Sequence, residues 1–141
     1  MASTVDVLNR LLALHSRSLP TYLASARPWI SENEQEAMTV LRHIAESQGE
    51  MVERLGTLVV DEGGVPHIGE FPMMFTDMHD LSLDYILPRL VEWIESDIVT
   101  IRQCIGELNG APPAKAIAEE ALGAAQAHLD SLHELQQSFS G

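Results

Sequence analysis

Four long segments of this chain carry apolar residues at the three- and four-residue spacing of an α-helix. The clearest is residues 121–136, ALGAAQAHLDSLHELQ, which continues the spacing of the residues just before it. Its apolar stripe consists of Ile117, Ala121, Ala125, His128, Leu132 and Leu135. No segment is predicted to be a strand. The pattern therefore predicts an all-α fold, in which four amphipathic helices bury their stripes against one another.

Prolines, glycines and capping residues indicate where the first two helices begin and end. The first is expected over residues 4–26, with a kink or local opening at Pro20, whose ring removes a backbone hydrogen bond. The second should begin at the capping box of residues 31–34, Ser-Glu-Asn-Glu. It should end at the Gly63-Gly64 pair, because glycine accepts the left-handed conformation that closes a helix.

The other two helices have similar signals at their ends. The third is expected to start at Asp77 or Asp80 and to run to about Leu108, where an Asn-Gly pair follows. The fourth should open at Pro112, since proline is tolerated in the first turn, and should continue to about Ser138.

The connection between the second and third helices, residues 65–78, has neither a helical nor a strand period. It is long for a compact domain but too apolar for a loose linker. We expect it to lie across the bundle with Phe71, Met74 and Phe75 packed inward. When extended it spans about 45–50 Å, so the chain can re-enter at the opposite end of the bundle. The short, long, short order of connections predicts a bundle with one crossover.

The charge balance disfavours several classes of partner. The 141 residues contain 21 acidic and 8 basic side chains, for a net charge of −13. Such a surface repels nucleic acid and anionic lipid, so we expect neither as a partner. No apolar run is long enough to span a membrane, and the N-terminus does not resemble a signal peptide. One cysteine, Cys104, is expected to be a small buried side chain. We expect a single domain over residues 1–141, located in the cytoplasm.

Four stretches carry a resemblance to a known family: LNRLLALHSRSLPTYL, MVERLGTLVVDEGGVP, IRQCIGEL and AHLDSLHEL, which begin at residues 8, 51, 101 and 127. In order and residue type the chain resembles the ferritin-like superfamily, bacterioferritin and the mini-ferritins in particular. The resemblance implies a ferritin-like four-helix bundle with a long crossover between helices 2 and 3. It also implies self-association, because members of the superfamily form dimers and cages.

The resemblance also locates the positions where that family binds two irons. There the ligands are a Glu from each of two helices and a Glu-x-x-His pair from each of the others. Most of these positions are replaced here, and only His128 keeps the family's residue. The replacements are His15, Ile44, Ser47, Ile94 (with Glu95 beside it) and Ala125, and Ala45 stands near the place of the haem methionine. A complete di-iron ferroxidase centre is therefore not expected.

Two interpretations of His15 and His128 remain open. Both lie on inward faces, so they can be buried imidazoles that bond to Tyr22, Ser47 or a water. Alternatively, they can form a mononuclear site for iron, zinc or copper, with Glu95 or Asp84 as a further ligand. A stable site of this kind needs about four ligands, which the pattern does not supply.

The remaining polar residues do not suggest catalysis. His43, Glu46, Glu50 and Glu53 share a helix face outside the apolar stripe, which is typical of a solvated surface. No nucleophile–base–acid arrangement or phosphate-binding glycine loop stands out. We therefore expect a diverged, self-associating structural or interaction protein that is not an enzyme. The alternative is a metal-binding protein with a rearranged ligand set that holds a single metal ion.

Overall fold

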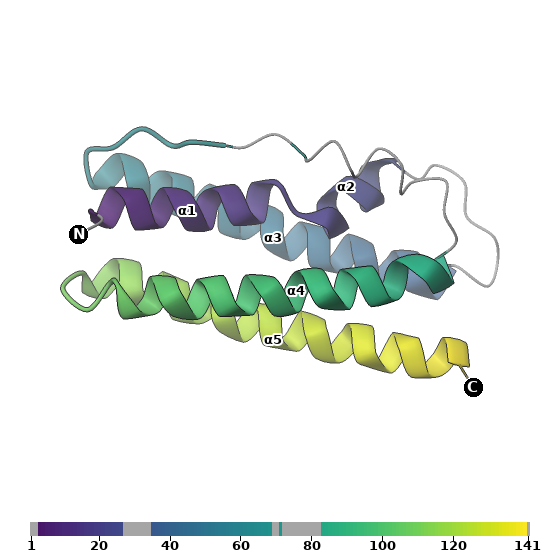
Figure 1. Ribbon diagram of the computed structural model, residues 1–141. Helices are drawn as coiled ribbons and strands as arrows, with labels where there is room; N and C mark the ends of the chain where they lie inside the picture. The colour runs from purple at the N-terminus through teal and green to yellow at the C-terminus, as the bar shows by residue number, and fades with distance from the viewer. Residues whose placement is uncertain (1–2, 27–34, 69–70, 72–82, 141) are drawn as a thin grey trace.

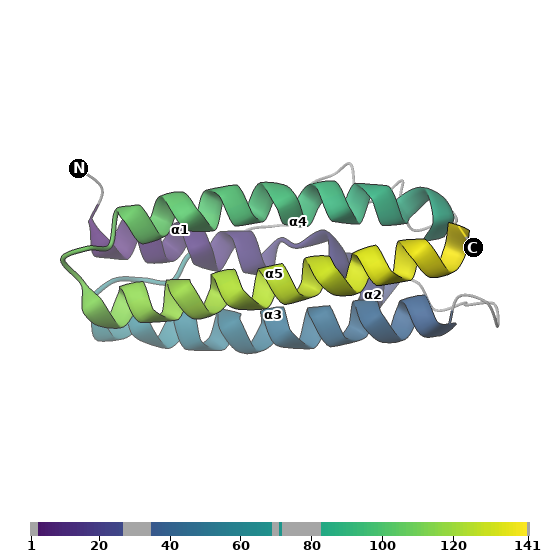
Figure 2. The same cartoon turned by 90° about the horizontal axis from the view of Figure 1, so that it is seen from below.

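In the computed structural model, residues 3–26, 35–68, 71 and 83–140 are described (Figure 1). These residues form five helices and no strand, which confirms the all-α prediction. The helices are α1 (Thr4–Ser16), α2 (Leu19–Ala26), α3 (Gln35–Asp61), α4 (Leu83–Gly106) and α5 (Pro112–Ser140). Since α1 and α2 follow one another along one edge, the five helices occupy the four positions of a bundle (Figure 2).

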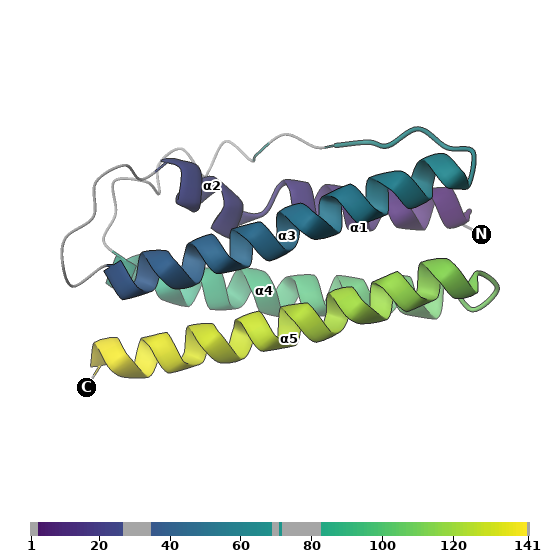
Figure 3. The same ribbon diagram turned by 180° about the vertical axis from the view of Figure 1, so that it is seen from behind.

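α1, α3, α4 and α5 run roughly along a common axis, whereas the short helix α2 is tilted away from it (Figures 1 and 3). α1 packs on α3, and α4 packs on α5, each pair running in opposite directions. The two pairs meet through α1 with α4 and through α3 with α5. α3 and α4 point the same way, so α4 begins at the end of the bundle opposite to the end where α3 finishes (Figure 3).

The first predicted helix is broken rather than kinked. α1 ends at Ser16, and α2 begins at Leu19. Pro20 cannot donate the hydrogen bond that would continue the helix past this point. Ser18 starts a new helix instead: its hydroxyl accepts a hydrogen bond from the Thr21 N–H at 3.1 Å. The same buried hydroxyl donates to Gln48 Oε1, so the break is anchored to α3.

The C-terminus of α3 has the predicted glycine closure. Gly63 has a φ of +83°, and its N–H bonds to the Val60 carbonyl, while the Gly64 N–H bonds to the Val59 carbonyl. These two bonds form a Schellman motif. A Cβ at Gly64 would lie 2.5 Å from a methyl carbon of Val5, so close packing on α1 also requires glycine there.

Several predicted helix ends differ or lie outside the described residues. α4 ends at Gly106 rather than Leu108, because the N–H groups of Glu107 and Leu108 turn to carbonyls three residues earlier. α5 starts at Pro112 as predicted and ends at Ser140, close to the expected Ser138. The predicted caps at residues 31–34, Asp77 and Asp80 fall outside the described part of the chain.

The described part of the connection after α3 lies against α1 and α2. The Asn9 amide donates to the Val65 carbonyl at 3.0 Å, and the His67 N–H donates to Asn9 Oδ1 at 2.8 Å. Further along, the Phe71 ring packs edge-on against Tyr22 with 5.3 Å between centroids. Phe71 is 39% exposed, so it covers α2 without being buried as expected. The expected packing of Met74 and Phe75 concerns residues outside the described part.

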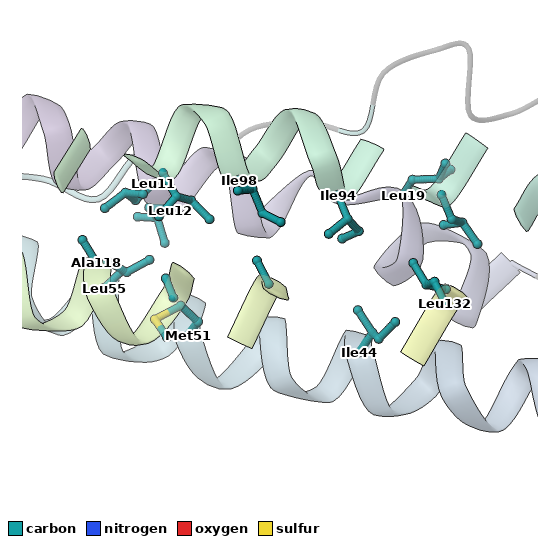
Figure 4. Close-up of a cluster of buried hydrophobic side chains, with 14 of the residues drawn as sticks. Leu11, Leu12, Leu19, Ile44, Met51, Leu55, Ile94, Ile98, Ala118 and Leu132 are labelled. Atoms are coloured by element: carbon teal, nitrogen blue, oxygen red, sulfur yellow. The ribbon is translucent and has the colours of Figure 1, made fainter. Parts of the chain in front are cut away.

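Apolar side chains from all four positions of the bundle fill its interior (Figure 4). Every member of the stripe predicted around residues 121–136 is buried. Cys104 is buried too, as expected. On α3, Gln48 is buried and Ser47 is half-buried. No described helix combines the length and apolarity needed to cross a membrane.

Candidate functional site

A small polar cavity of about 10 Å³ lies at the centre of the bundle. All four positions of the bundle contribute a polar side chain to it: His15 from α1, Ser47 and Gln48 from α3, Asp97 from α4 and His128 from α5. The other lining residues are apolar or small: Leu14, Met51, Ile94, Ile101, Ala121, Ala124 and Ala125. The cavity is about the size of one water molecule, and its walls offer enough partners to hydrogen-bond one.

His15 is buried and bonds within its own helix. Its Nδ1 lies 2.7 Å from the Leu11 carbonyl oxygen. Because a carbonyl can only accept, Nδ1 carries the proton, and Nε2 remains as an acceptor. Burial lowers the pKa of His15, and the bond to Leu11 offsets only part of that effect. His15 is therefore a neutral imidazole, as one interpretation predicted, but its partner is neither Tyr22 nor Ser47.

His128 is the second buried imidazole, and its partner was among those predicted. Its Nε2 lies 3.2 Å from Ser47 Oγ on α3. The ring of His43 stands at 88° to it, with 6.4 Å between centroids. Burial, followed by the nearby charges of His43 and His15, lowers the pKa of His128 to about 4. At neutral pH the centre therefore contains two uncharged imidazoles.

Asp97, like Gln48, is a site residue that the sequence analysis missed. It is only 8% exposed, and its buried Oδ2 has no hydrogen-bond partner in the described part of the chain. Burial raises the pKa of Asp97 to about 7. One signal was available: Asp97 lies three residues after Ile94 and four before Ile101, so it shares their face of α4.

Glu95, the third residue of the predicted metal site, does not lie with His15 and His128. It is exposed, because adjacent residues on a helix point in different directions and its neighbour Ile94 faces the core. The side chain of Asp84 lies outside the described part. Among the residues that are described, no three His, Cys, Asp or Glu side chains gather closely enough to hold a metal ion.

The charged stripe of α3 is solvated, as predicted. His43, Glu46, Glu50 and Glu53 are all exposed. Ile44, Met51 and Leu55, on the other side of the helix, face the core.

Comparison with known proteins adds no assignment. No family model and no curated protein matches the chain. The chemical groups of the site itself are therefore the basis for its possible functions. It offers two neutral imidazoles, a hydroxyl, an amide and a carboxyl group whose pKa is near 7, which together can bind a water and exchange a proton.

Proposed function

We propose that the protein is a diverged ferritin-like four-helix bundle, with a long crossover between α3 and α4 and without a complete di-iron ferroxidase centre. In this proposal it acts as a self-associating structural or interaction protein. The observation that carries the proposal is the filling of the bundle centre. Ile44, Ile94 and Ala125, which stand where the family would place carboxylates, are buried apolar side chains. His15 is hydrogen-bonded to the Leu11 carbonyl, and His128 is hydrogen-bonded to the Ser47 hydroxyl.

A group of exposed apolar side chains supports the self-association part of the proposal. Val60, Val65 and Ile68 lie around the end of α3 and are 59%, 70% and 68% exposed. We call these three residues the exit patch. Large apolar side chains that follow one another closely on a surface are typical of contact sites.

Sedimentation velocity tests this part of the proposal. The wild-type protein should sediment as a species larger than its 15.5 kDa chain. The double variant Val65→Glu/Ile68→Glu should shift it to the monomer. Val99→Glu is the matched control, because Val99 is equally apolar, 55% exposed and on α4. A wild-type protein that is monomeric across the accessible concentration range would contradict self-association.

Metal titration separates this proposal from the alternative of a metal-binding protein with a rearranged ligand set. Protein purified without chelator is analysed for metal, then titrated with Fe²⁺, Zn²⁺ and Cu²⁺. We expect no stoichiometric binding. Binding of one ion per chain that disappears in both His15→Ala and His128→Ala, but persists in His133→Ala, would establish the alternative. His133 is exposed on α5 and serves as the control.

A further inference from the structure

A surface groove of about 300 Å³ lies between α1 and α4. Each helix contributes residues spaced by four and then three positions, which places them on one face. These are Arg10, Leu14 and Arg17 on α1, and Trp93, Asp97 and Thr100 on α4. Leu14 and Asp97 also line the central cavity, so they form the wall between the groove and the bundle centre.

The groove differs in charge from the rest of the molecule. Two of the eight basic side chains of a chain with net charge −13 line it. Arg10 forms an ion pair with Glu107, with 2.7 Å between Nη1 and Oε2. Arg17 uses its Nε in a bond to the Ala13 carbonyl, and its terminal nitrogens have no partner in the described residues. Arg17 therefore presents a fixed positive group to the groove.

The other lining residues indicate which anion would fit. Thr100, on the opposite helix from Arg17, can donate a hydroxyl hydrogen bond into the groove. Leu14 and the half-buried Trp93 provide an apolar wall against which a hydrocarbon or aromatic body can pack. Burial raises the pKa of Asp97, which weakens the repulsion that its carboxylate would otherwise exert on an anion. A volume of about 300 Å³ is at the lower end of the range for pockets that bind small molecules.

We propose that the α1–α4 groove is a binding site for a small carboxylic acid with an apolar body. The carboxylate pairs with the guanidinium of Arg17, in the two-point geometry that arginine favours, and accepts a hydrogen bond from Thr100. The apolar body lies along Leu14 and Trp93.

Phenylacetate is the probe, and 2-phenylethylamine is the control of nearly the same size and opposite charge. Backbone amide shifts are followed by NMR during titration of each. Phenylacetate should bind with a Kd of about 1 mM, and the amine should bind at least about tenfold more weakly. The shifts should concentrate in residues 10–17 and 93–100, not in α3 or α5.

Two substitutions test the role of arginine. Arg17→Gln should weaken phenylacetate binding by about tenfold, because it removes a charged hydrogen-bond donor. Arg102→Gln should leave it unchanged, since Arg102 is exposed on α4 outside the groove. Thr100→Val should cause a smaller loss. Absence of saturable binding, equal affinity for the amine, or unchanged affinity in Arg17→Gln would each overturn the proposal. A thermal melt of Arg17→Gln checks that the variant is folded.

Discussion

At the scale of single residues, the centre of this bundle shifts the pKa values of an acid and a base in opposite directions. Burial raises the pKa of Asp97 to about 7 and lowers that of His128 to about 4. Both shifts have the same cause, because a poorly hydrated site favours the uncharged form of either group. Near neutral pH the centre can therefore be polar and still carry little charge.

These shifts predict how stability depends on pH. The folded protein holds the Asp97 proton more tightly than the unfolded chain does. Protonated Asp97 therefore contributes its full stabilisation below pH 3.8, and this stabilisation is lost as the pH rises through about 7. His128 behaves in the opposite way, since its contribution is complete above 6.5 and is lost as pH falls through about 4. Between pH 4 and 6.5 the two effects should largely cancel in the wild-type protein.

Asp97→Asn should remove that cancellation. The free energy of unfolding of the variant should rise relative to wild type by about 1.4 kcal/mol per pH unit between pH 4 and 7, up to about 4 kcal/mol. Urea unfolding at several pH values measures the difference. Glu95→Gln, on the exposed side of α4, should follow wild type at every pH. A constant offset for Asp97→Asn across this range would show that the carboxyl group titrates normally.

The sequence revealed part of this site through helical spacing alone. His15 and His128 occupy stripe positions, and both are buried as predicted. Asp97 escaped prediction because Ile98 beside it also fits the spacing, and a carboxylate is normally expected at the surface. Glu95 was chosen because it adjoins Ile94, but a step of one residue turns a side chain out of the shared face. Hydrogen-bond partners such as Leu11 depend on rotamers, which spacing does not encode.

At the scale of helices, the structure confirms the predicted ends that a glycine or a proline determines, as at Gly63 and Pro112. The break between α1 and α2 was less predictable, because Pro20 is compatible with either a kink or a new helix. What decides between them is a tertiary contact: Ser18 reaches Gln48 on another helix.

Removing the Ser18–Gln48 contact should destabilise the protein more than removing a nearby serine hydroxyl that bonds within its own helix. Ser18→Ala deletes the cap of α2 and leaves the buried Gln48 carbonyl without its closest donor. We expect a loss of about 2–3 kcal/mol in the free energy of unfolding. Ser16→Ala is the control, since the Ser16 hydroxyl bonds only to the Ala13 carbonyl of its own helix, and should cost less than about 0.5 kcal/mol. Equal losses would mean that Ser18 does not hold the break.

Alanine substitutions should distinguish glycines that close α3 from a glycine that only weakens a helix. Gly64→Ala should destabilise by about 1–3 kcal/mol, because the new methyl group would collide with Val5. Gly123→Ala, inside α5 with nothing within 4 Å, should stabilise by about 0.5–1 kcal/mol. Thermal unfolding of the two variants provides the comparison. A stable Gly64→Ala protein would show that Val5 can move aside.

At the scale of the whole molecule, the dominant feature is the excess of 21 acidic over 8 basic residues. The ion pairs Arg10–Glu107 and Arg54–Glu120 link helices, but both are exposed and contribute little. Repulsion should therefore outweigh attraction. The all-α class was predictable because periodicity extends over whole helices, whereas the surface groove depends on how two helices pair.

Salt should consequently stabilise the fold. Raising NaCl from about 10 mM to about 150 mM shortens the screening length from about 30 Å to about 8 Å. We expect Tm to rise by roughly 2–4 °C, equivalent to about 1 kcal/mol. Choline chloride should have the same effect, because screening does not depend on which cation supplies it. A fall in Tm, or a rise with sodium alone, would contradict the explanation.

The two hydrogen bonds that join the Asn9 side chain to the backbone of Val65 and His67 have a consequence for folding during synthesis of the chain. Asn9, Val65 and His67 all leave the ribosome before α4 does, because they precede it in the chain, so α1 and α3 can pair early. At roughly 5–20 residues per second, several seconds pass between the synthesis of His67 and that of the last turn of α5. During that interval the apolar faces of α1 and α3 that later meet α4 and α5 remain uncovered. The nascent chain is therefore exposed to aggregation until α4 and α5 emerge, and its acidic surface opposes this.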